Sequence, residues 1–190
     1  MPDTESRIGI ISAKQGKQAG LSYMKLSRLV KQGKLERVAR GVYESMDEPD
    51  DILYVEQLRR PKIVYSHSTA LYLHDLTDHD NVSITVTVPA GYNTMGLLKE
   101  GFKAFSVKRE MYESDIIELP TNSGHLVRVY GLERTIVDVV RSRNKMDPEI
   151  VTTALKRFAL RKGKNVPLLS RTAERFGVSK LITTFMLVLL

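Results

Sequence analysis

The stretch from Ser12 to Tyr43 constrains the fold most, because two glycines divide it into elements of fixed length. Ser12–Ala19 has the length of a short helix, and Gly20 provides a tight turn after it. Ser22 is a good N-cap for a second helix, which Gly33 ends from the usual position after the last turn. The pattern predicts two short helices joined by a sharp turn.

The second helix has one apolar face. Leu26, Leu29 and Val30 follow the i, i+3, i+4 spacing that buries one side of a helix. The residues that this leaves for the other face are Tyr23, Lys25, Arg28 and Lys31. Two short apolar runs follow, Leu35–Val38 and Val42–Glu44, around Ala39-Arg40-Gly41. Helix, turn, helix and a hairpin with a basic tip predict a winged helix-turn-helix.

The charge of this module favours DNA. Residues 7–43 hold nine Lys and Arg and one acidic residue, Glu36. A recognition helix enters the major groove with its N-terminal residues toward the bases, while other cations neutralise phosphates. We therefore expect base or nearby phosphate contacts from Ser22, Tyr23 and Lys25. Phosphate contacts are expected from the remaining polar residues of both helices and the wing: Lys14, Gln15, Lys17, Gln18, Arg28, Lys31, Lys34, Arg37 and Arg40.

Charge also divides the whole chain of 190 residues into three parts. Residues 1–43 have a net charge of +6, residues 44–125 of −7 and residues 126–190 of +8. Two basic ends around an acidic middle indicate a polyanionic partner, either nucleic acid or another anionic surface. The chain has no cysteine, which excludes disulfides and thiolate metal sites.

An acidic stretch at about residues 45–51 predicts a linker between a winged helix-turn-helix domain, 1–45, and a second domain, 46–190. In the second domain we expect helices at Ile52–Arg59 and Ser66–Leu73. Alternating apolar and hydroxyl residues predict a half-buried strand at Val82–Val88. Further strands are expected at Phe102–Val107 and Leu126–Tyr130.

From Gly131 onward the pattern is helical. Leu132, Ile136, Val139 and Val140 form one apolar stripe, and Asp147-Pro148 is typical of a helix start. Further helices are expected at Val166–Phe176 and Ser179–Leu190. The fold class is α+β: an N-terminal winged helix-turn-helix, then a mixed α+β domain with a small sheet and a helical C-terminal end.

The order of these motifs resembles the AbiEi antitoxins, the transcriptional regulators of bacterial abortive-infection (type IV) toxin–antitoxin pairs that act in phage defence. The resemblance extends over nearly the whole chain, with a short segment before Ser12 where the family usually has a first helix. The residues that carry it are Gly20-Leu21-Ser22, Leu29–Tyr43, His67–Leu76, Val86–Pro89, Leu132–Arg141 and the helix after Met146-Asp147-Pro148.

The resemblance implies a protein with two functions and no catalysis. The N-terminal domain would bind inverted repeats in its own promoter and repress the operon. The C-terminal domain would neutralise a nucleotidyltransferase-like toxin without a stable complex. Candidate residues for that task are Arg134, Asp138, Arg141, Lys156, Arg157 and Arg161.

Two other side-chain groups have simpler explanations. Arg134 and Asp138 are four residues apart on one helix, so a structural ion pair is the main interpretation and a toxin-antagonising surface the alternative. A second group resembles a metal site, but its spacing is loose for zinc and its acids fall in a turn, so no metal or other cofactor is expected. Its members are His67, His74, Asp75, Asp78, His79 and Asp80.

Two other classes of function stay open beside a DNA-binding antitoxin. A nuclease with a winged-helix targeting domain needs clustered acids beside a strand, and Val82–Val88 has none. A protein-interaction module without DNA binding, or a stand-alone regulator, fits the basic helical end. The longest apolar run, in Leu181–Leu190, is about half as long as a membrane span, and the N-terminus lacks the pattern of a signal peptide. We therefore expect a cytoplasmic protein. The end of that run, Met186–Leu190, packs either on its own domain or on a second copy.

Overall fold

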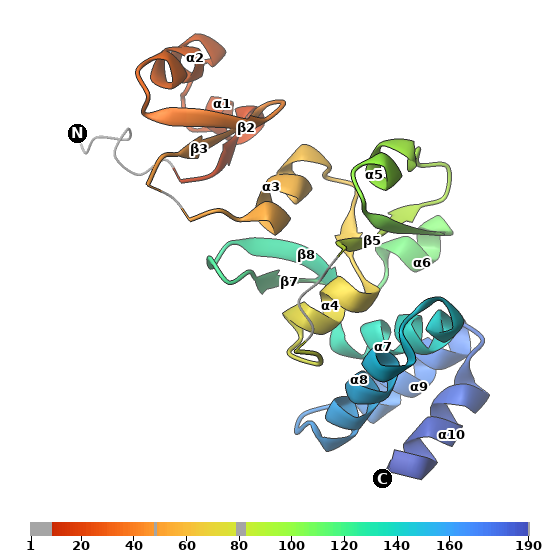
Figure 1. The fold of residues 1–190 in the computed structure, drawn as a ribbon. Coiled ribbons are helices and arrows are strands. Elements are labelled where there is room, and N and C mark those ends of the chain that lie inside the picture. The colour runs from red at the N-terminus through yellow and green to blue at the C-terminus, as the bar shows by residue number, and fades with distance from the viewer. Residues whose placement is uncertain (1–8, 48, 79–82, 190) are drawn as a thin grey trace. The chain divides into compact units, whose positions relative to one another are not determined.

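The computed structural model describes residues 9–47, 49–78 and 83–189. These residues form a mixed α+β structure with two small sheets, which confirms the predicted fold class (Figure 1). The chain divides into two compact units. The first comprises the chain up to Lys62 together with Pro120–Val127, and the second comprises Ile63–Leu119 and Arg128–Leu190.

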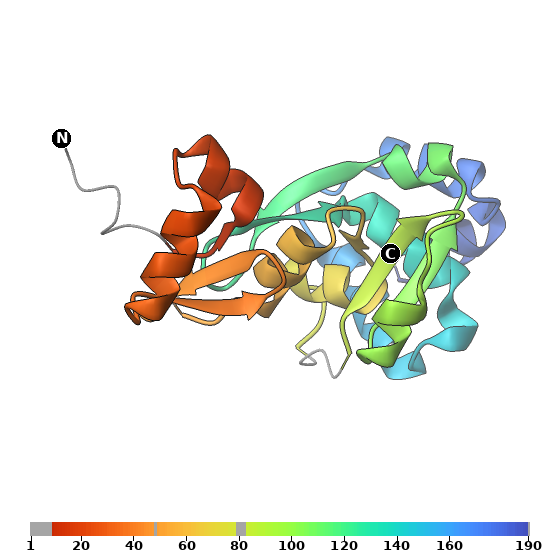
Figure 2. The same cartoon turned by 90° about the horizontal axis from the view of Figure 1, so that it is seen from above.

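The first unit contains the winged helix-turn-helix. Its sheet has the strand order β1-β3-β2, and both strand pairs are antiparallel. Helices α1 and α2 lie beside the β2–β3 hairpin (Figure 2). The elements are β1 (Ile11–Ser12), α1 (Ala13–Gln18), α2 (Tyr23–Lys31), β2 (Leu35–Ala39) and β3 (Val42–Ser45). Strand β1 was not predicted, because two residues are too few to show a period.

Local side-chain contacts explain where these helices begin and end. Ser12 and Gln15 form a reciprocal capping box at the start of α1. The Ser22 hydroxyl accepts a hydrogen bond from the Lys25 amide at 3.2 Å and caps α2. Gly33 ends α2 with φ of 68°, a left-handed conformation that favours glycine. The predicted cap at Ser22 and the predicted end of the second helix at Gly33 are confirmed, whereas the capping box at Ser12 was not predicted.

Close packing holds α1 against α2. A Cβ atom at Gly16 would lie 3.3 Å from Leu26 Cδ1, so only glycine fits without displacing that leucine. Beneath the two helices, Leu21, Leu26, Leu29, Leu35 and Tyr43 form a buried apolar cluster. This core fixes which face of α2 remains exposed.

Helix α3 (Ile52–Arg59) has the predicted bounds, and the end of the predicted linker anchors it. Asp51 is 5% exposed and accepts the Tyr54 amide, which makes it the N-cap of α3. The same carboxylate accepts hydrogen bonds from the Thr121 hydroxyl and from His125 Nδ1, whose ring stacks on Tyr54. The first unit thus extends further along the chain than residues 1–45.

The sheet of the second unit has the order β6-β5-β4-β8-β7. Strand β5 is parallel to β6 and antiparallel to β4, and β4 is parallel to β8. The strands are β4 (Val64–Tyr65), β5 (Thr85–Pro89), β6 (Lys103–Val107), β7 (Ile116–Pro120) and β8 (Leu126–Tyr130). The predicted strands at Phe102–Val107 and Leu126–Tyr130 are confirmed, whereas β4 and β7 were not predicted.

The predicted half-buried strand at Val82–Val88 differs from the structure in its start and in its burial. Val82 lies outside the described residues, and Ser83 and Ile84 precede the strand, which begins at Thr85. Thr85 and Thr87 are each 1% exposed, so both faces of β5 are buried. Their hydroxyl-bearing face is buried because it packs on α4, where Thr69 Oγ1 accepts the Thr85 amide and Ser66 Oγ accepts the Thr87 hydroxyl.

Helices make up the rest of the second unit. Helices α7, α8, α9 and α10 pack together at its C-terminal end (Figure 1). Every residue from Glu133 to Val140 is buried, so α7 lies at the centre of the unit. The helices are α4 (His67–Leu73), α5 (Met95–Lys99), α6 (Arg109–Glu113), α7 (Leu132–Arg141), the 3₁₀ helix η1 (Arg143–Lys145), α8 (Pro148–Leu160), α9 (Val166–Arg175) and α10 (Ser179–Leu189).

The large core of this unit lies between α7 and its neighbouring helices. It includes Ile136 and Val140 of α7, Phe158 of α8 and Leu169 of α9. None of the helices within the described ranges has the length and apolar character needed to cross a bilayer.

Candidate functional site

The exposed face of α2 is the first candidate site. Around the helix, Tyr23, Met24, Arg28 and Lys31 are exposed on the side opposite the buried Leu26 and Leu29. A helix that presents cations and amphipathic side chains on one face has the chemistry to lie in a DNA groove. This face contains three of the four residues expected from the sequence.

At the N-terminal part of that face, the exposed residues differ from those predicted. Lys25 is half-buried at the flank of α2 rather than exposed on its face. Met24, which sequence reasoning did not select, is 79% exposed, and Tyr23 is 65% exposed. One signal in the sequence could have identified Met24: a helical wheel places it between Tyr23 and Arg28 and away from Leu26 and Leu29.

Helix α1 and the hairpin add further exposed polar groups to the first unit. The exposed residues are Lys14, Lys17, Gln18, Ser22, Lys34, Arg37 and Arg40, and Gln15 is half-buried. Gln15 instead contacts the body of the unit, because its Nε2 donates to the Tyr54 hydroxyl at 3.3 Å. Arg40 and Gly41 form the tip of the hairpin, where Ala39 pairs with Val42 and Gly41 has φ of 76°.

Arg28 and Lys31 also have an ordinary structural explanation. Both lie in the last turn of α2, where cations offset the partial negative charge of the helix end. That interaction is worth about 0.3–1 kcal/mol at an exposed position. The same explanation covers Lys17 in the last turn of α1, but it does not account for Lys14 or for Arg40 at the hairpin tip.

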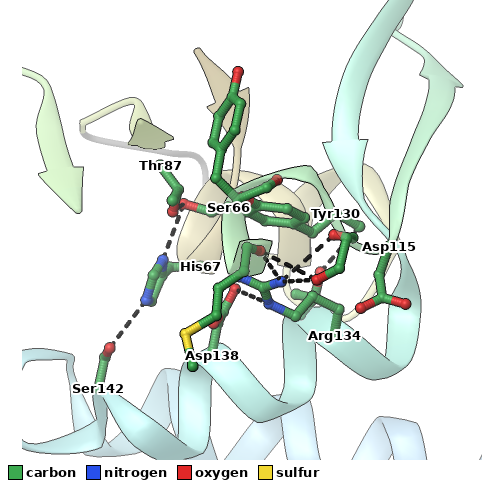
Figure 3. Close-up of polar contacts among 12 residues, drawn as sticks. Ser66, His67, Thr87, Asp115, Tyr130, Arg134, Asp138 and Ser142 are labelled. Carbon is green, nitrogen blue, oxygen red and sulfur yellow. Dashed lines mark hydrogen bonds and ion pairs between the residues drawn. The ribbon is translucent and has the colours of Figure 1, made fainter. Parts of the chain in front are cut away.

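A buried polar cluster around Arg134 is the most elaborate side-chain arrangement of the second unit (Figure 3). The Arg134 Nε donates to Asp138 Oδ2 at 3.0 Å, and Nη1 donates to the Met111 carbonyl at 2.7 Å and to Ser114 Oγ at 3.0 Å. Its guanidinium lies between two aromatic rings, 4.1 Å from the Tyr130 centroid and 4.0 Å from that of Phe176.

The pair of Arg134 and Asp138 is therefore an internal ion pair. The two residues are 1% and 4% exposed, so neither offers a side chain to a protein partner at the surface. The alternative expectation, a toxin-antagonising surface that includes Arg134 and Asp138, does not agree with this burial. The guanidinium replaces most of its hydration with a carboxylate, backbone and hydroxyl acceptors and two ring faces, and only its Nη2 has no hydrogen-bond partner.

A chain of hydroxyl and imidazole groups lies beside the ion pair (Figure 3). The Thr87 hydroxyl donates to Ser66 Oγ at 2.9 Å, and Ser66 Oγ lies 3.0 Å from His67 Nδ1. His67 Nε2 lies 3.0 Å from Ser142 Oγ, and the Phe105 ring stacks on the imidazole at 3.6 Å. Ser66 was predicted to begin the second helix of this domain and is the N-cap residue of α4, but its hydroxyl belongs to this hydrogen-bonded chain and does not cap the helix.

Electrostatics decides what this histidine can do. Burial, with Arg134 and Arg141 nearby, lowers the pKa of His67 to about 3. The ring is neutral at pH 7 and is a poor general base, since an effective base has a pKa near the working pH. Burial raises the pKa of Asp138 to about 6, although the guanidinium of Arg134 opposes this shift.

The residues of the suspected metal group do not converge. His67 and His74 have separate partners, because His74 Nε2 donates to the Tyr130 carbonyl at 2.8 Å. Asp78 pairs with Arg157, while His79 and Asp80 lie outside the described residues. Across the parts of the chain with described structure, no three His, Asp or Glu side chains are placed to hold a metal ion.

The basic residues of the helical end have different surroundings. Arg157 pairs with Asp78, and Arg161 Nη1 donates to the His74 carbonyl. Both therefore stabilise contacts within the unit. Lys156 and Arg141 are exposed, and Arg141 also lies over the Phe176 ring, with its Cζ 5.7 Å from the ring centroid.

One comparison with known proteins concerns the N-terminal segment of the first unit. Residues 4–45 match the sequence model of a family described as "Transcriptional regulator, AbiEi antitoxin". The resemblance drawn from the sequence is thereby confirmed for this segment, and it supports a role as an antitoxin or transcriptional regulator. A search of curated proteins found no match.

A solved structure resembles the chain more loosely. The crystal structure of the RV2827C protein from Mycobacterium tuberculosis has a TM-score of 0.47 and 11% sequence identity to this chain. The superposition covers 95% of this chain and 76% of that one.

Proposed function

We propose that this chain is an autorepressing antitoxin that binds inverted repeats in its own promoter. The observation that carries the proposal is the exposed face of α2, with Tyr23, Met24, Arg28 and Lys31, inside the segment that matches an antitoxin regulator family. Helix α2 enters the major groove, and the hairpin tip at Arg40 contacts phosphates or the adjacent minor groove.

The residues have separate tasks in this proposal. Tyr23 and Met24, beside the Ser22 cap, lie at the helix end that reaches base edges. The exposed cations of the first unit neutralise backbone phosphates and supply most of the affinity. Lys25, which is half-buried, contributes a phosphate contact at the edge of the interface.

Footprinting on the DNA upstream of the chain's own gene tests this proposal. We expect protection of an inverted repeat, with a strong decrease in affinity as salt increases. If no repeat is protected even at concentrations at which the protein binds DNA nonspecifically, the autorepressor function is contradicted. The stand-alone regulator is supported instead if the protein protects a repeat only at other promoters.

Neutralisation of a nucleotidyltransferase-like toxin is the second part of the proposal, and we place it in the second unit. Its exposed cations Arg141 and Lys156 are the candidates that remain free to meet a partner after burial and internal pairing are considered. Arg157 and Arg161 support the surface from within, through Asp78 and the His74 carbonyl.

Separation of the two activities tests this division. A variant with Arg28, Lys31 and Arg40 replaced by Ala should lose repression and still protect cells that express the toxin from the adjacent gene. Loss of protection together with repression would contradict the division. Stable co-purification of chain and toxin, without DNA affinity, would favour a protein-interaction module.

A further inference from the structure

A cavity of about 300 Å³ lies within the second unit, next to the buried polar cluster. Its deepest walls come from three buried residues, His67, Thr87 and Asp138. Strand β6 supplies one side through Phe105, Ser106 and Val107. The end of α7 and helix η1 supply the rim through Arg141, Ser142, Asn144 and Lys145. Neither the metal hypothesis nor DNA binding uses this cavity.

The rim is cationic. Arg141 and Lys145 are exposed, and neither forms an ion pair with a residue in the described ranges. In contrast, Arg134, Arg157 and Arg175 each lie within 4 Å of a carboxylate. The positive charge at the rim is therefore available to an anion, and the hydroxyl and amide groups of Ser142 and Asn144 lie beside it.

The floor offers an acceptor instead. Asp138 Oδ2 accepts from Arg134, whereas Asp138 Oδ1 has no hydrogen-bond partner among the described residues. A side chain that is 4% exposed and lines a cavity has one direction left for that oxygen, which is the cavity itself. Asp138 Oδ1 is not one of the fully buried side-chain atoms that lack a partner, so water in the cavity reaches it, and a hydroxyl donor of a ligand would replace that water.

The ordinary explanation covers only part of this arrangement. Arg141 and Lys145 follow the C-terminal end of α7, where cations offset the partial negative charge of the helix. That explains the position of Arg141 in the last turn. It explains neither the hollow beside it nor a carboxylate oxygen of Asp138 without a partner.

We propose that this cavity binds a small phosphate monoester with free hydroxyl groups, of the size of a sugar phosphate. The phosphate lies at the rim between Arg141 and Lys145, and a hydroxyl group of the ligand donates to Asp138 at the floor. The volume is at the lower end of ligand pockets, which matches a single sugar phosphate. The backbone of a nucleic acid would place a phosphate at the rim but would leave the floor of the cavity, beside Asp138, unoccupied.

Isothermal titration calorimetry on the full chain, with ribose 5-phosphate as the probe, tests the proposal. We expect saturable binding at one site, weaker binding of inorganic phosphate and no binding of ribose, because only the first probe has both groups. Arg141→Ala and Lys145→Ala should each weaken binding about tenfold or more. Lys180→Ala, which removes an exposed cation of the same unit away from the cavity, should leave it unchanged.

A second variant tests the cavity rather than its charge. Ser106 is an exposed residue of β6, so Ser106→Phe places a ring in the mouth of the cavity. It should abolish binding while the circular dichroism spectrum and thermal unfolding stay as in the wild type. Absence of ribose 5-phosphate binding at millimolar concentration, or unchanged binding in the Arg141 variant, would overturn the proposal. So would equal binding of inorganic phosphate, or competition by a short duplex DNA of unrelated sequence at equal phosphate concentration. None of these results depends on whether the first unit binds a promoter.

Discussion

Helices α2 and α7 are both short and both contain arginine, but Arg28 of α2 and Arg134 of α7 have opposite surroundings. In α2, Arg28 is exposed opposite a buried leucine face. In α7, Arg134 is 1% exposed, and its guanidinium is enclosed by Asp138, two backbone or hydroxyl groups and two aromatic rings.

The difference shows what determines the role of an arginine. The first unit has a small core on one side of α2, so the opposite face remains in solvent. The second unit surrounds α7 with α4, α8, α9 and α10, so every face of α7 requires an internal partner. One guanidinium is available to bind DNA, and the other holds a fold together.

Replacement of Arg134 by Ala should have the largest effect. It leaves Asp138 buried without its cation, which typically lowers the free energy of unfolding by about 3–5 kcal/mol. Arg28→Ala should change it by less than about 0.5 kcal/mol, because the side chain is exposed. Urea unfolding followed by circular dichroism measures both. A double variant, Arg134→Met with Asp138→Leu, should recover part of the loss, and equal effects of the two single variants would contradict the comparison.

For DNA affinity we expect the opposite order, with the larger effect from the exposed cations of the first unit. The variant with Arg28, Lys31 and Arg40 replaced by Ala should bind the operator on the order of 100-fold more weakly at about 0.1 M salt. The slope of log K against log salt should flatten by about one for each lost phosphate contact. Replacement of the exposed Lys99, Lys103 and Lys108 removes the same charge from the second unit and is the matched control. If the control has the same effect, total charge rather than the α2 face governs binding.

The pH dependence of stability tests the buried side of the comparison. Because the pKa of His67 is lowered to about 3, the folded chain keeps this ring neutral while the unfolded chain protonates it below about 6.5. Stability should fall as pH falls from about 6.5 toward 3, by up to about 1.4 kcal/mol per pH unit. His67→Asn, which tolerates the φ of 48° at this position, should remove that part of the slope.

The raised pKa of Asp138 acts in the opposite direction. Its contribution to stability is lost as pH rises from about 4 to about 6, and it is present in both proteins, so it cancels in the difference between wild type and variant. Identical slopes in the two proteins would mean that His67 is not held neutral.

The smallest expected effect is the one of Met24 on DNA affinity. Its exposed side chain, next to Tyr23, suits an apolar contact with the methyl group of thymine in the major groove. An operator fragment with uracil in place of every thymine should bind the wild type about three- to tenfold more weakly, which corresponds to roughly 1 kcal/mol. Met24→Ala should bind thymine DNA as weakly as the wild type binds uracil DNA and should not distinguish the two. Equal sensitivity to uracil in both proteins would exclude Met24 as the reader, and the footprint itself would still stand.

The sequence of the first unit predicted its fold well because the signals are local. Ser12, Ser22 and Gly33 act on neighbouring backbone groups, and their positions alone define where α1 and α2 begin and end. The site was predicted less well, although its signal is also local. Lys25 was expected on the exposed face, but the helical period already places Lys25 beside Leu29 and Met24 on the opposite side, as the structure has them.

Prediction of the second unit was weaker because its signals are not local. Strand β4 has two residues and forms only through pairing with β5 and β8, which lie far along the chain. The threonines of β5 indicated a solvent face, but α4 covers them with hydroxyl partners. The cavity beside His67 joins α4, β5, β6, α7 and η1, and no motif in the sequence connects these segments.

By itself, the sequence determined the helix-turn-helix, the basic hairpin and the i, i+4 spacing of Arg134 and Asp138, because each depends on residues within a few turns of one another. Only the tertiary structure decided which cations face solvent and which are enclosed. The physical reason is that water solvates a guanidinium at the surface, whereas a buried guanidinium must replace that hydration with protein groups. Here those groups come from segments that only the fold brings together.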